Sequence, residues 1–129
     1  MELLVDFHCK NMALMREKAL LEEWLLDMAK KIGMTPHGEP KVEDYPLPDR
    51  EGTALSGVVF LGESSITIHT YPEFQRVFLN VFSCKDFSIA ATRAYIERTF
   101  RVTSSRAFAF QRGIDMRTGR LLPFGPIWP

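Results

Sequence analysis

The chain has 129 residues, a length that suits one domain with its own core. Its 16 basic and 16 acidic residues cancel, so the overall charge favours neither nucleic acid nor an anionic membrane as partner, and a small molecule fits better. Two cysteines are too few for a disulfide scaffold and lack zinc-site spacing, which predicts reduced thiols and no metal. No long apolar segment or secretory signal pattern is evident, so a soluble cytoplasmic protein is expected.

The first predicted elements are an apolar strand over residues 3–8 and a helix that Asn11 caps and Gly33 ends. Apolar residues recur at helical spacing between these two positions: Leu14, Leu21, Trp24, Leu25, Met28 and Ile32. Residues 34–53 hold four prolines, two glycines and several acidic residues, Asp49 and Glu51 among them, so we expect a loop with little regular structure there.

The second half of the chain is predicted to be rich in strands. Three segments have β character, residues 55–61, 65–70 and 76–83, and the connections between them are too short for helical crossovers. Asp86 is expected to cap a helix that runs to about residue 99, before residues 102–110 resume β character. The order β-α-β-β-β-α-β predicts an α+β fold, an antiparallel sheet with two helices packed on one face as a two-layer sandwich. The apolar tail 121–129 either packs on its own domain or serves an interface.

One segment combines a turn with several polar side chains. Ser64 and His69 are five residues apart, so in an unbroken strand they would point to opposite faces. The chain must therefore bend at Ser64, where Gly62 permits unusual dihedral angles and where a strained peptide bond favours attack by a hydroxyl. Parity places Cys84 on one face with Phe78, Asn80 and Phe82, and if that face meets the bend, the thiol can reach it.

These residues resemble the small prokaryotic form of the S-adenosylmethionine decarboxylase family, in which a Glu-Ser bond of the chain is cleaved. The resemblance covers roughly residues 3–112. It rests on Val5-Asp6-Phe7 near the start, Ser56-Gly57-Val58-Val59, the pair Glu63-Ser64, the run His69-Thr70-Tyr71-Pro72-Glu73, and Cys84. Motif matches of this kind are hypotheses about chemistry that the structural context must support.

The resemblance implies a role for each matched residue. Ser64 would be the precursor of a pyruvoyl group, which condenses with the substrate amine, and Glu63 would precede the cut. The single domain 1–129 would then become fragments 1–63 and 64–129. His69 would be the base for processing, Ser56 would support it, and Cys84 would return a proton to the product. No metal and no pyridoxal phosphate would be needed.

Substrate contacts are predicted for Tyr71, Glu73 and Phe7. Tyr71 stands where the family carries tryptophan, Asn80 where aspartate is usual, and Arg50 where an aromatic residue is common. The resemblance implies S-adenosylmethionine as the substrate, in polyamine biosynthesis, and these departures leave L-ornithine or L-arginine as the alternative. Two further hypotheses stay open: an unprocessed paralogue that acts as a regulatory or binding subunit, and an interaction domain with a relic motif.

A homo-oligomer is expected, a dimer of cleaved protomers or larger, because a chain of this size needs a second subunit to build a deep pocket. His8 and His37 have no partners at metal-ligand spacing, and Cys9 is assigned to the core.

Overall fold

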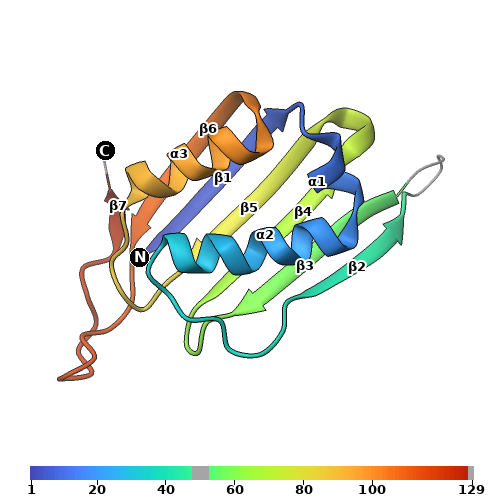
Figure 1. The fold of residues 1–129 in the computed structure, drawn as a ribbon. Helices are drawn as coiled ribbons and strands as arrows, with labels where there is room; N and C mark the ends of the chain where they lie inside the picture. Colours follow the sequence, from blue (N-terminus) through green and yellow to red (C-terminus); the bar gives the residue numbers. More distant parts are fainter. Residues whose placement is uncertain (48–52, 128–129) are drawn as a thin grey trace.

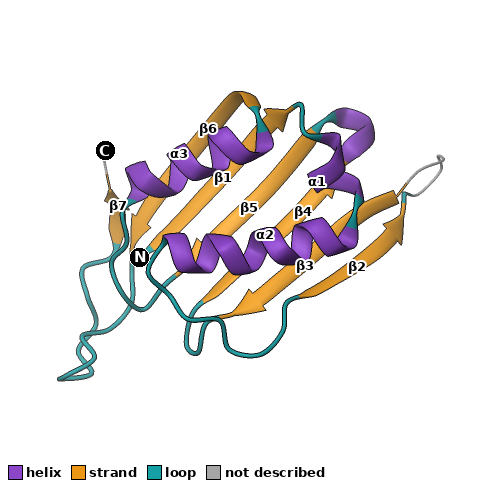
Figure 2. Cartoon of the chain, in the orientation of Figure 1, coloured by secondary structure: helices purple, strands orange, loops and turns teal. Residues whose placement is uncertain are grey.

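Alternation of apolar and polar residues builds the sheet from its first strand onward. Leu3, Val5 and Phe7 are buried, whereas Leu4 and the other intervening residues face the opposite side. The structure is a computed structural model that describes residues 1–47 and 53–127. It contains one sheet with helices on one side only (Figures 1 and 2), so the predicted α+β sandwich is confirmed.

The sheet has seven strands in the order β2-β3-β4-β5-β1-β6-β7, and all neighbours are antiparallel. The strands are β1 Glu2–Cys9, β2 Lys41–Pro46, β3 Thr53–Phe60, β4 Ser65–Tyr71, β5 Arg76–Phe82, β6 Val102–Gln111 and β7 Gly125–Ile127. The helices are α1 Met12–Arg16, α2 Lys18–Lys31, α3 Ile89–Phe100 and a 3-10 turn, η1 Pro72–Phe74.

The core lies between the helices and one face of the sheet. The Phe100 ring of α3 is fully buried and makes edge-to-face contacts with Phe7 and Trp24, at centroid distances of 5.1 and 4.9 Å. Thr70 ties β4 to the helical layer, because its hydroxyl donates a 2.7 Å hydrogen bond to the Met15 carbonyl. Burial of these side chains holds the sheet and the helices together.

The other face of the sheet carries no helix in the part of the chain that the structure describes, and we call it the open face. Strand register places polar and aromatic side chains in rows across it. One such row runs through Glu43, Ser56, His69, Phe78, Asp6 and Arg106. Aromatic side chains on this face are partly exposed, with Phe78 at 40 % and Phe108 at 43 %. These rows define the geometry of the candidate site.

Two predictions for the first half were wrong in part. Residues 34–53 are not wholly irregular, because β2 pairs with β3 there and buries Val42 at the edge of the sheet. Its proline, Pro46, is the last residue of an edge strand, where a missing N–H is tolerated. The helix after Asn11 is interrupted, since Glu17 adopts an extended conformation between α1 and α2.

In the second half, the three middle strands and the strand after the last helix were correctly predicted. The cap of α3 is Ser88 rather than Asp86, because the Ser88 hydroxyl accepts the Ala91 N–H at 3.1 Å. The tail packs on its own domain in part, where β7 pairs with β6. Across residues 1–47 and 53–127, no helix is long and apolar enough to cross a membrane.

Candidate active site

Ser64 lies in the connection between β3 and β4, and its side chain is only 3 % exposed. Gly62 has a φ of +74°, which an L side chain rarely adopts, so glycine permits the turn. The Leu61 N–H donates to the Ser64 carbonyl at 2.8 Å, and this hydrogen bond closes the turn. The chain therefore bends beside Ser64, as the sequence predicted.

The structure brings Ser64 and Cys84 together. The Ser64 hydroxyl donates to the Cys84 sulfur at 3.4 Å, and the Cys84 N–H donates to the Ser64 oxygen at 2.9 Å. Register alone does not explain this contact. Because Ser65 pairs with Phe82, the next cross-strand neighbour of Ser64 is Ser83, not Cys84. Cys84 reaches Ser64 because the chain bends after β5 ends.

Ser56 and His69 form a second pair. They lie directly opposite each other on β3 and β4, and the Ser56 hydroxyl is 2.7 Å from Nδ1 of the imidazole. Both line a hollow of about 280 Å³ on the open face, together with Lys41, Glu43 and Tyr45. When Nδ1–H donates to Ser56, Nε2 is left as the basic atom.

The two pairs do not form one site within the chain. His69 is five strand positions from Ser64, a separation of roughly 16 Å at the usual rise per residue. Ser64 is buried, whereas His69 is exposed on the open face. The resemblance therefore identified the four residues one by one, and the structure arranges them as two pairs that β4 separates.

The predicted substrate contacts lie away from Ser64. Tyr71 packs edge-to-face on Phe78, with centroids 5.7 Å apart, on the same face as His69. Glu73 is exposed in η1, which follows β4 at the end of the strand opposite Ser64. The Phe7 ring is 2 % exposed and packs in the core, so the structure does not bring it to either pair. Arg50, like Asp49 and Glu51, lies outside the described residues.

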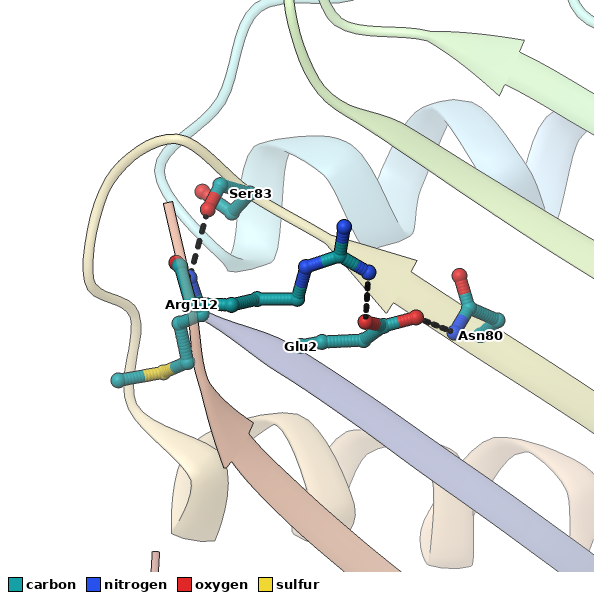
Figure 3. A network of polar contacts seen from close by, with 5 residues as sticks. Glu2, Asn80, Ser83 and Arg112 are labelled. Atoms are coloured by element: carbon teal, nitrogen blue, oxygen red, sulfur yellow. Dashed lines mark hydrogen bonds and ion pairs between the residues drawn. The ribbon is translucent and has the colours of Figure 1, made fainter. Parts of the chain in front are cut away.

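A polar network that sequence reasoning missed lies at the end of β5 (Figure 3). The Glu2 carboxylate accepts from the Asn80 amide at 2.8 Å and from Arg112 at 2.9 Å. The Arg112 guanidinium also lies over the Phe82 ring, 5.0 Å from its centroid. Asn80 can donate to Glu2, whereas the aspartate that is usual there would place a second carboxylate beside it. Only the register between β1 and β5 reveals this pairing.

The two thiols lie in different surroundings. Cys9 is fully buried, as expected from the sequence, and burial raises its pKa to about 11. Cys84 is only partly buried, beside Ser64. Within the described ranges, no group of three or more His, Cys, Asp or Glu side chains could hold a metal ion.

Comparison with known proteins gives concordant results. Residues 1–113 match the family model for S-adenosylmethionine decarboxylase. An S-adenosylmethionine decarboxylase proenzyme of Thermodesulfovibrio yellowstonii is 30 % identical over 124 residues, covering 94 % of this chain and 86 % of the relative. Another from Clostridium kluyveri is 28 % identical over 102 residues, covering 78 % and 76 %.

A solved structure has the same fold. The crystal structure of the adenosylmethionine decarboxylase from Aquifex aeolicus matches with a TM-score of 0.69, covering 88 % of this chain and 90 % of that chain. The two sequences are 23 % identical, so this likeness is evidence for the fold alone.

Proposed function

Because the chain belongs to the S-adenosylmethionine decarboxylase family, we propose that it is a proenzyme that cleaves itself between Glu63 and Ser64 and then decarboxylates S-adenosylmethionine. The observation that carries this function is the contact of the buried Ser64 hydroxyl with Cys84, in a bend that follows Gly62. These two contacts fix the orientation of the hydroxyl that is proposed to attack the preceding peptide bond, and this supports the proposal.

Maturation begins when the Ser64 oxygen attacks the Glu63 carbonyl carbon, which breaks the peptide C–N bond and leaves an ester. The hydroxyl proton passes to the nitrogen of residue 64, which becomes a free amine. A base then removes the α-proton of residue 64, the Cβ–O bond breaks, and Glu63 departs as a carboxylate. Water replaces the nitrogen of residue 64, ammonia leaves, and a ketone remains. Fragments 1–63 and 64–129 result.

His69 is the base assigned to the elimination, and Ser56 orients it through Nδ1. In turnover, the pyruvoyl ketone supplies an electrophile that takes up the substrate amine and accepts the electrons released with carbon dioxide. Cys84 then donates a proton to the former α-carbon. This step requires a protonated thiol rather than a permanent thiolate.

The active protein is proposed to be a homo-oligomer, a dimer of cleaved protomers or larger. Two observations support this. The Ser56–His69 pair lies on the open face, away from Ser64 of its own chain, and that face exposes Leu4, Phe78 and Phe108 at 40–45 %. A second copy packed on the open face would cover these side chains and bring its own His69 toward the first copy's Ser64.

S-adenosylmethionine is the proposed substrate because the relatives are named for it. Nothing in the comparisons favours ornithine or arginine. The test is release of labelled carbon dioxide from each of the three carboxyl-labelled compounds, with Ser64→Ala as control. We expect release from S-adenosylmethionine only, and none from the control. Release from ornithine or arginine alone would show that this amino acid, and not S-adenosylmethionine, is the substrate. No release from any of the three compounds would favour a non-catalytic paralogue.

A further inference from the structure

Ser83 is a buried polar residue that the proposed function leaves without a role. Its side chain is fully buried on the helix side of the sheet, directly after β5, where the preceding inward residues are Leu79 and Val81. A hydroxyl at such a position costs free energy unless it is hydrogen-bonded, so its partners indicate what it does.

The Ser83 hydroxyl joins two backbone groups of one residue. It donates to the Lys85 carbonyl at 2.6 Å and accepts the Lys85 N–H at 3.0 Å. The Ser83 backbone is fixed as well, because its N–H donates to the Met1 carbonyl and its own carbonyl accepts from the Met1 nitrogen, both at 2.9 Å. Figure 3 draws the second of these bonds. Ser83 thus anchors one end of the bend to β1 while its side chain holds the other end.

Cys84 lies in the middle of this bend, between Ser83 and Lys85. If β5 continued straight, parity would place Cys84 on the open face with Phe82, whereas Ser64 has the buried parity of Ile66. The bend instead turns both the N–H and the thiol of Cys84 onto the Ser64 hydroxyl. The contact on which the proposed chemistry depends therefore requires the turn at residues 83–85.

We propose that Ser83 is a positioning residue for this site: its buried hydroxyl holds the bend that keeps Cys84 in contact with Ser64. The inference rests on the proposed function, since Ser83 acts on cleavage and decarboxylation only through Cys84. Without the hydroxyl, the N–H and carbonyl of Lys85 lose their shared partner, and the bend opens toward water.

The test compares Ser83→Ala, which removes the hydroxyl, with Ser83→Thr, which keeps it. The matched control is Thr92→Val, because Thr92 is also buried and also bonds a backbone carbonyl, Ser88 at 2.7 Å, but in α3. Cleavage of freshly translated chains is followed by mass spectrometry, and thermal unfolding is measured on each. We expect cleavage about tenfold slower in Ser83→Ala, restored in Ser83→Thr and unchanged in Thr92→Val.

A second readout does not depend on cleavage. The rate at which iodoacetamide alkylates Cys84 is measured from peptide masses, with buried Cys9 as internal reference. Rates are compared only between chains in the same state, either all cleaved or all uncleaved. We expect Ser83→Ala to raise the Cys84 rate several-fold, leaving Cys9 unchanged, and Ser83→Thr to match the wild type.

Three results would overturn the positioning role: wild-type cleavage and alkylation rates in Ser83→Ala, failure of Ser83→Thr to restore them, or equal slowing of cleavage in Thr92→Val. If no chain cleaves, the wild type included, the proposed function fails. The alkylation rates then decide alone whether Ser83 holds Cys84.

Discussion

The Ser64–Cys84 corner and the Ser56–His69 pair are built by different means. Turns build the corner: Gly62 bends one connection, Ser83 holds the other, and Ser64 between them is 3 % exposed. Strand register alone builds the pair, which lies flat on the open face with room beside it. The corner is therefore closed within one chain, whereas the pair points outward and can serve a neighbouring molecule.

A complementation experiment tests most directly whether the Ser56–His69 pair of one copy acts on the Ser64–Cys84 corner of another. Ser64→Ala keeps an intact His69, and His69→Ala keeps an intact Ser64. If the pair of one copy serves the corner of another, neither variant is cleaved alone, but in mixed oligomers the His69→Ala chain is cleaved. Coexpression with distinguishable tags, followed by mass spectrometry, measures this.

Each variant expressed alone is the control for that experiment. Cleavage of His69→Ala by itself would remove the histidine from maturation. Absence of cleavage in verified mixed oligomers would mean that the pair acts on its own chain, after a rearrangement of β4.

Cys84→Ala separates the two stages of the reaction. Its backbone N–H still reaches the Ser64 oxygen, so we expect self-cleavage to persist. The rate of decarboxylation should fall about 10²- to 10⁴-fold, which is the usual contribution of a positioned proton donor. The measurement is carbon dioxide release per mole of cleaved chain. Undiminished turnover would exclude Cys84 as the donor.

Paired phenylalanine substitutions compare the two faces of the sheet. Phe100→Ala should lower the free energy of unfolding by about 3–5 kcal/mol, because it empties a fully buried ring site. Phe78→Ala should cost less than about 1.5 kcal/mol in the monomer, because the ring is 40 % exposed, but should weaken self-association. Urea unfolding at low protein concentration measures the change in stability, and sedimentation measures the change in self-association. Equal losses of stability would contradict an open face.

The last prediction concerns the pH dependence of stability. Burial raises the pKa of Cys9 from 9.0 to about 11, so the folded state favours the neutral thiol. The resulting stability is fully present below pH 9 and is lost as pH rises through about 11. Relative to Cys9→Val, the free energy of unfolding of the wild type should fall by on the order of 2 kcal/mol across this pH range. Parallel loss in both proteins would show that other groups dominate.

Local patterns predicted most of the fold. Alternation in β1 and β4 and helical spacing along α2 are properties of short segments, so they could be identified without the tertiary structure. Strand β2 was missed because prolines and acidic residues surround one buried side chain, Val42, whose burial depends on pairing with β3. Edge strands of this kind depend on their neighbours.

The candidate site was predicted residue by residue but not as an arrangement. Spacing and resemblance identified Ser64, Cys84, Ser56 and His69, and a turn beside Ser64 was expected from Gly62. Parity gave a wrong reason for that turn, because Ser64 and His69 do lie on opposite faces of the sheet. The two pairs are separated by the length of β4. The contact of Cys84 with Ser64 depends on where β5 ends, and the role of Ser83 depends on contacts with Lys85 that sequence parity does not contain. A departure from regular strand geometry determines the Ser64–Cys84 contact, and it is visible only in three dimensions.

The most direct test is the intact mass of the freshly purified protein, beside Ser64→Ala. The account predicts two fragments, 1–63 and 64–129, the second with a blocked amino end and without the serine nitrogen, and one uncut chain for the variant. A single continuous chain of 129 residues with an ordinary serine at position 64 in the wild type would contradict it.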